Sequence, residues 1–156
     1  MRTDLRRGAP AGRAAPPASG TLPLSTRVVG AALVLATGWI HLHLWLGGYQ
    51  DIRWIGPLFL ANVILALLGG MVVLLAPDRW VPVVALLAGL FEGASLIALL
   101  LSLTVGLLGF TEAWSAPLVA PTLLIEGAGF VLLAGFGTTE LRRSRQRTAG
   151  GRPWPG

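Results

Sequence analysis

Four long apolar segments, at residues 28–46, 57–76, 81–103 and 117–136, constrain this chain more than any other feature of its sequence. At 1.5 Å per residue in a helix, each is long enough to cross the roughly 30 Å hydrocarbon core of a bilayer. None of them alternates apolar and polar residues with a sustained period of two, as the strands of a membrane barrel do. The sequence therefore predicts an all-α fold, an antiparallel bundle of four transmembrane helices within residues 28–136.

The composition indicates that lipid is the solvent for most of the chain. Only 12% of the 156 residues are charged, whereas a soluble domain carries about 25%. A soluble domain of this size could not hide so much apolar surface, because a large share of its area faces water. The chain has no cysteine, which excludes disulfide scaffolds, thiolate metal sites and cysteine nucleophiles.

The positive charges gather at the two ends of the chain. All twelve basic residues are arginine, and eleven of them lie in residues 1–27, in residues 137–156 or in the turn at 77–80. An even number of spans places these three segments on one side, and the positive-inside rule assigns that side to the cytoplasm. We therefore expect a multi-pass protein of the inner (cytoplasmic) cell membrane, with disordered basic tails at 1–27 and 137–156 that both lie in the cytoplasm.

Each predicted span carries one polar or ionisable residue at a similar depth. These residues are His41, Asn62, Glu92 and Glu126, and they lie about 15–21 Å from the cytoplasmic ends of their helices at 1.5 Å per residue. An ionisable residue at the centre of a membrane helix costs at least about 2.5–3.5 kcal/mol, so such residues are functional candidates. In each helix the polar residue shares a face with small or hydroxylated residues, which favours an inward orientation. We therefore expect an intramembrane polar layer near the bilayer midplane.

Helical spacing identifies the companions of these residues. Thr37 shares a face with His41, and Ser95 lies one turn beyond Glu92 on the third span. His43 follows His41 by two positions, about 200° around a helix, so both cannot serve one site. The third span also carries a stripe of small residues of the kind that lets helices approach closely, at Ala85, Gly89 and Gly93.

Three interpretations fit the polar layer. The first is structural, with hydrogen bonds between helices that hold the bundle in register and contribute about 0.6–2 kcal/mol each. The second is a proton-relay or quinone-type pocket in which a buried carboxyl trades its proton. The third is a metal site in which His41, Glu92 and Glu126 supply two carboxylates and an imidazole, a ligand set that suits iron, manganese or zinc.

The function that these observations favour is a small integral membrane protein with a polar intramembrane pocket, acting as an accessory or assembly component. The alternatives are a membrane-embedded oxidoreductase linked to a metal or a quinone, and a proton-coupled transporter of small solutes that acts as an oligomer. The expected partners are the lipid bilayer and either a second copy of the chain or another membrane protein. Nucleic acid is not expected, because the arginines lie in tails beside apolar spans and not on a folded face.

One stretch of the sequence resembles a known group of proteins. It comprises Ile40-His41-Leu42-His43-Leu44-Trp45, then Gly48-Tyr49, then Ile55-Gly56-Pro57-Leu58-Phe59-Leu60. It is similar to the corresponding stretch of small four-span membrane proteins from high-GC Gram-positive (actinobacterial) bacteria, and the resemblance covers about residues 28–136. The resemblance implies a four-helix integral membrane protein and brings no established activity with it.

Overall fold

Four long α-helices make up the structure, a computed structural model that describes residues 24–150. The helices are α1 (Leu24–Leu46), α2 (Ile55–Leu75), α3 (Val81–Thr104) and α4 (Val119–Gly150), and a short 3-10 helix, η1 (Tyr49–Asp51), lies between α1 and α2. Each of the four is long and apolar enough to cross a membrane. The predicted all-α, four-helix fold is confirmed, and the chain is a small multi-pass membrane protein.

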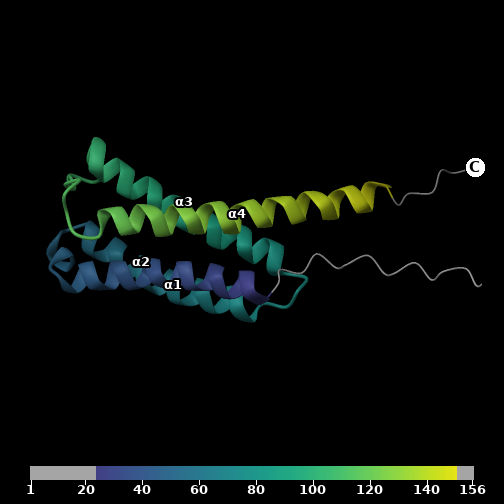
Figure 1. The fold of residues 1–156 in the computed structure, drawn as a ribbon. Coiled ribbons are helices and arrows are strands. Elements are labelled where there is room, and N and C mark those ends of the chain that lie inside the picture. Colours follow the sequence, from purple (N-terminus) through teal and green to yellow (C-terminus); the bar gives the residue numbers. More distant parts are fainter. Residues whose placement is uncertain (1–23, 151–156) are drawn as a thin grey trace, which may run out of the picture.

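Successive helices run in opposite directions and form two packed pairs, α1 with α2 and α3 with α4 (Figure 1). α1 also packs on α4, whereas α2 and α3 contact each other much less than the members of either pair do. α3 crosses α4 at an angle (Figure 1). We call the end of the bundle that holds residues 47–54 and 105–118 the loop end, and the opposite end, which holds the turn at 76–80, the turn end.

Local sequence signals set several helix ends. α1 is followed by Gly47 and Gly48, and Gly48 adopts a φ of 120°, which L side chains rarely adopt. α3 has Pro82 in its first turn, where the missing N–H costs no helical hydrogen bond. Beyond the end of α3, Gly106 has a φ of 85° and donates its N–H to the carbonyl of Leu101 at 2.9 Å. Glycines after α1 and α3 and a proline at the start of α3 therefore keep the connections tight.

Glycines let α3 and α4 approach each other closely. A Cβ atom placed on Gly89 would overlap the backbone nitrogen of Ala134, and one placed on Gly137 would lie 2.6 Å from the backbone nitrogen of Leu86. Both clashes involve backbone atoms, which cannot move aside as a flexible side chain can. The small-residue stripe predicted on the third span is thus part of the α3–α4 interface.

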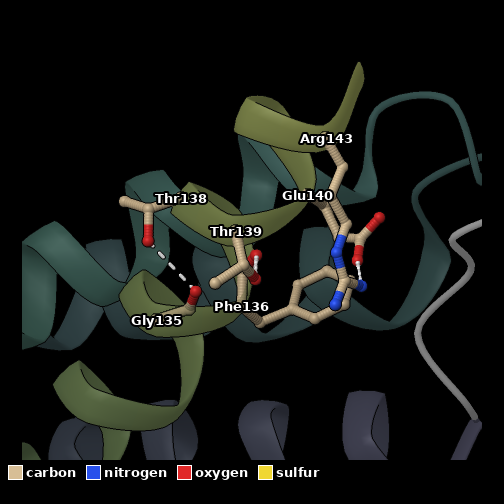
Figure 2. Close-up of polar contacts among 6 residues, drawn as sticks. All are labelled: Gly135, Phe136, Thr138, Thr139, Glu140 and Arg143. Atoms are coloured by element: carbon tan, nitrogen blue, oxygen red, sulfur yellow. Dashed lines mark hydrogen bonds and ion pairs between the residues drawn. The ribbon is translucent and has the colours of Figure 1, made fainter. Parts of the chain in front are cut away.

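α4 extends beyond the span that the sequence predicts at 117–136, and it ends at Gly150. The segment 137–150, expected as part of a disordered tail, is helical. One reason is the ion pair between Arg143 Nη1 and Glu140 Oε1 at 2.6 Å, which joins residues one turn apart on the helix (Figure 2). A second reason is composition, because arginine is a good helix former and positive charge is favourable near a helix C-terminus.

Two threonines lie where the apolar part of α4 ends. Thr138 donates its hydroxyl to the carbonyl of Gly135 at 3.0 Å, and Thr139 donates to the carbonyl of Phe136 at 2.8 Å (Figure 2). Such bonds to the preceding turn satisfy a hydroxyl inside a helix. α4 can therefore pass from apolar to basic sequence without leaving these two side chains unpaired.

The N-terminal tail expected at 1–27 is also shorter than predicted, because residues 24–27 belong to α1. Within this first turn, Arg27 forms an ion pair with Asp78 and donates from Nη1 to the carbonyl of Ala76 at 2.9 Å. These contacts join the start of α1 to the turn between α2 and α3. The remaining tail residues, 1–23 and 151–156, lie outside the described residues.

Large apolar side chains cover the outside of the bundle, as lipid-facing helices require. They are densest on α2, where Leu58, Leu60, Ile64, Leu65, Leu67, Leu68, Met71, Val72, Leu74 and Leu75 are exposed. Trp39 lies in the middle of α1 and is 67% exposed, so it also faces outward. A soluble protein rarely exposes apolar patches of this extent, whereas a bilayer accepts them.

Candidate functional site

The four residues of the predicted polar layer all lie inside the bundle, one on each helix. Glu92 on α3 and Glu126 on α4 are 0% exposed, and His41 on α1 is 8% exposed. Asn62 on α2 is half-buried. The inward faces expected from small and hydroxylated neighbours are therefore the faces that the helices turn toward one another.

Hydrogen bonds arrange the layer as two groups. In the first, Thr37 on α1 donates its hydroxyl to Oε2 of Glu92 on α3 at 2.9 Å. In the second, Asn62 on α2 donates from Nδ2 to Ser95 Oγ at 2.9 Å, and Ser95 on α3 donates to Oε1 of Glu126 at 2.6 Å. α3 takes part in both groups, so the polar layer links all four helices.

Thr37 and Ser95 are the partners of the two carboxyls, a role that sequence reasoning did not assign to them. Each was identified only as a companion on the face of another residue. The available signal was spacing, because Thr37 lies one turn before His41 and Ser95 one turn after Glu92. Hydroxyls at such positions are natural donors to a carboxyl on a neighbouring helix.

Gly129 makes room for the Glu92 side chain between α3 and α4. A Cβ atom on Gly129 would lie 2.9 Å from Cγ of Glu92. Gly129 is three residues after Glu126 and on the same face of α4. Both carboxyls thus lie at the α3–α4 interface, less than one helical turn apart along α4.

A single hydrogen bond defines the protonation of the His41 ring. Nδ1 of His41 lies 2.9 Å from the carbonyl oxygen of Thr37. A carbonyl can only accept, so Nδ1 carries the hydrogen, and in the neutral ring Nε2 is left as an acceptor. The ring also packs edge-on against Phe59, with centroids 4.8 Å apart. His41 therefore offers a lone pair from a ring of fixed orientation.

A cavity of about 180 Å³ lies between the helices in the half of the bundle nearer the loop end. Its wall includes His41 and Asn62 of the predicted layer but neither Glu92 nor Glu126. Its polar wall residues are His41, Asn62, Ser95, Ser102, Glu112 and Thr122, and its apolar ones are Leu44, Ile55, Leu58, Phe59, Ala98, Leu99, Leu107, Phe110, Pro117 and Val119. The cavity is therefore mostly apolar, with a few polar atoms at defined places, as small-molecule sites usually are.

Three buried oxygen atoms of the polar layer have no hydrogen-bond partner within the described part of the chain. They are Asn62 Oδ1, Glu92 Oε1 and Glu126 Oε2. Most buried polar atoms in proteins are paired, so unpaired ones point to a ligand, a water molecule or a bound proton. The amide oxygen of Asn62 can only accept, so the group missing there is a donor, whereas each carboxyl oxygen can either accept or carry a proton.

Tyr49 and Glu112 close the cavity at the loop end. The Tyr49 hydroxyl donates to Oε2 of Glu112 at 2.6 Å. The Tyr49 ring stacks on Phe59 with centroids 5.1 Å apart and meets Phe110 edge-on at 5.8 Å. Burial, together with the hydrogen bond to the Glu112 carboxylate and its charge, raises the pKa of Tyr49 to about 12. Nothing in the sequence predicted that these two loop residues would contact each other.

Within the described residues, His41, Glu92 and Glu126 are not grouped as ligands of one metal ion. Among residues 24–150 no group of three or more His, Cys, Asp or Glu side chains is placed to hold a metal ion. The physical reason is that each of the three side chains is hydrogen-bonded to another group. His41 is hydrogen-bonded to the backbone carbonyl of Thr37, Glu92 to the Thr37 hydroxyl and Glu126 to the Ser95 hydroxyl.

Comparisons with protein-family profiles, curated proteins and solved structures found no match for this chain. The fold and the site therefore define its class, which is a small multi-pass membrane protein built as a four-helix bundle.

Proposed function

We propose that this protein is a membrane-embedded accessory protein that binds one small amphiphile, a molecule with a single-ring head that donates a hydrogen bond and an apolar tail. The observation that carries the proposal is Asn62 Oδ1, a buried acceptor without a partner among residues 24–150, on a side chain that lines the cavity. His41 lies in the same wall and offers Nε2 as a second acceptor. A site of buried acceptors selects a ligand that bears a hydroxyl or an N–H group.

The size of the cavity suits one ring. A cavity of about 150 Å³ in a protein core holds benzene, and this one measures about 180 Å³. Aromatic wall residues, Phe59 and Phe110, provide surfaces against which a ring can pack. A larger head would have to displace side chains that the Tyr49 contacts hold in place.

The surface of α2 supports access from the bilayer. Leu58 lies in the wall of the cavity and is also 48% exposed on the outside of the bundle. α2 and α3 pack loosely against each other, so the tail of the amphiphile can leave between them into lipid. A ligand dissolved in the membrane would then reach the site without crossing water.

The arginines support an orientation with both termini in the cytoplasm. Arg27, Arg79 and the arginines of the α4 extension lie at the turn end, whereas Arg53 lies at the loop end. The positive-inside rule then places the turn end in the cytoplasm and the cavity in the outer half of the membrane. The protein would belong to the inner (cytoplasmic) membrane of the cell.

Two probes of nearly the same shape test the proposal. 4-Propylphenol has a ring, a short tail and one hydroxyl donor, and 4-propylanisole replaces that hydroxyl by a methoxy group that cannot donate. We expect the full-length protein in detergent to bind the phenol roughly 10-fold more tightly, because the ether leaves a buried acceptor unpaired. Equal affinities, measured by isothermal titration calorimetry, would contradict the proposal.

A pair of variants on α3 tests whether binding occurs in the cavity. Ala98 lies in the cavity wall, whereas Ala94, one turn earlier, is exposed on the outside of the bundle. Ala98→Phe fills the cavity and should abolish binding of 4-propylphenol, and Ala94→Phe should leave the affinity unchanged. Binding that survives Ala98→Phe would place the phenol elsewhere.

A further inference from the structure

The two buried carboxyls of the polar layer have no positively charged partner among residues 24–150. Glu92 and Glu126 are 0% exposed, and each has one oxygen without a hydrogen-bond partner in this described part of the chain. The arginines of the described bundle lie at its ends, where Arg27 pairs with Asp78 and Arg53 lies over the ring of Trp54. A charge held inside a membrane bundle needs a counter-charge or a proton.

Ser95 connects one of these carboxyls to the cavity. It donates to Glu126 Oε1 at 2.6 Å, it accepts from Asn62 Nδ2 at 2.9 Å, and it is itself part of the cavity wall. A serine hydroxyl has one donor and two acceptor positions. The second acceptor position of Ser95 is therefore available to a donor in the cavity.

We propose that Glu126 is a proton-binding site that exchanges its proton with the cavity through the hydroxyl of Ser95. In the inward step, a hydroxyl group or a hydronium ion in the cavity transfers a proton to Ser95 Oγ. At the same time Ser95 transfers its own proton to Glu126 Oε1. One O–H bond breaks and one forms at each transfer. Glu126 becomes neutral, and the donor in the cavity loses one proton.

Few other titratable groups face this site from the surrounding helices. α3 contributes Glu92, α1 contributes His41, and the loop end contributes Glu112 in the far wall of the cavity. α2 carries no titratable side chain. Glu92 is hydrogen-bonded to Thr37 and not to Ser95, and neither Glu92 nor Thr37 is part of the cavity wall. Glu126 therefore has the more direct connection to the cavity, through Ser95. The site needs only the cavity wall and does not depend on the amphiphile proposed above.

Infrared spectroscopy of the full-length protein in liposomes tests the proposal without added ligand. A protonated carboxyl has a C=O stretching band that shifts when its hydrogen is exchanged for deuterium. At neutral pH we expect such a band from the wild type, and Glu126→Gln should remove it or reduce its intensity. A spectrum that Glu126→Gln does not change would overturn the proposal.

The rate of that shift after transfer to D₂O tests the route through Ser95. Ser95→Ala should slow the exchange of the Glu126 band by at least ~10-fold, because a proton moves only between groups within hydrogen-bond reach. Ser95→Thr keeps the hydroxyl and should exchange like the wild type. Ser102→Ala is the matched control, since Ser102 also lies in the cavity wall but donates to the carbonyl of Leu99. Unchanged exchange in Ser95→Ala would overturn the route.

Discussion

The Tyr49 hydroxyl donates a hydrogen bond of 2.6 Å to Oε2 of Glu112, and this contact joins the loop after α1 to the loop after α3. Glu112 and the two phenylalanines that contact the Tyr49 ring belong to the wall of the cavity. Tyr49 thus holds three wall residues together across the loop end.

Tyr49→Phe keeps the ring contacts and removes only the hydrogen bond. We expect the free energy of unfolding to fall by about 1–2 kcal/mol, the range for a partly buried bond to a carboxylate. Backbone amides of residues 47–54 should lose protection in hydrogen exchange, while those in the middle of α1 keep theirs. Unchanged protection of the loop in Tyr49→Phe would show that the ring contacts alone hold it.

The Tyr49 hydroxyl can be titrated directly, because Tyr49 is the single tyrosine of the chain. Tyrosinate absorbance of the folded protein should report a pKa of about 12, against about 10 in the unfolded chain. The folded state therefore holds this proton more tightly, so the contribution of Tyr49 to stability is complete below pH ~10 and is lost as the pH rises through about 12. In Glu112→Gln the pKa should move part of the way down, since burial, the largest cause, remains. A folded-state pKa near 10 would contradict the burial of this hydroxyl.

Two glycines of α4 test the close approach of α3. Gly137 lies against the backbone of α3, whereas a Cβ atom on Gly135 would meet no atom of another helix within 4 Å in the described structure. Gly137→Ala should destabilise the bundle by about 1–3 kcal/mol through overpacking. Gly135→Ala should leave stability equal or higher, because alanine favours the helix by up to about 1 kcal/mol. Unfolding in a denaturing detergent measures both, and equal losses would contradict the packing described.

The proposed orientation can be tested with single cysteines, because the natural chain has none. Ser115 is exposed at the loop end and Gln146 is exposed on the α4 extension. In intact cells a membrane-impermeant maleimide should label Ser115→Cys and should label Gln146→Cys only after the cells are opened. The reverse pattern would place the cavity in the cytoplasmic half of the membrane.

The four-helix fold could be predicted from the sequence, because the length and hydropathy that define a membrane span are local properties of the chain. The sequence was also sufficient to place His41, Glu92 and Glu126 inside, since small residues on one helix face indicate the face that packs. The contact of Tyr49 with Glu112 could not be predicted, because it joins residues 63 apart whose meeting depends on how two loops fold over the bundle. The helical segment 137–150 differs from the disordered tail that its charge predicts, because its arginines are also good helix formers.

If Asn62 Oδ1 recognises the donor group of the ligand, the ratio of two affinities depends on this one atom. Asn62→Leu has nearly the same side-chain shape and removes the unpartnered acceptor from the cavity wall. The wild type should bind 4-propylphenol roughly 10-fold more tightly than 4-propylanisole, and in Asn62→Leu this preference should shrink toward equality. A preference for the phenol that persists undiminished in Asn62→Leu would contradict the assignment of Asn62 as the group that recognises the ligand.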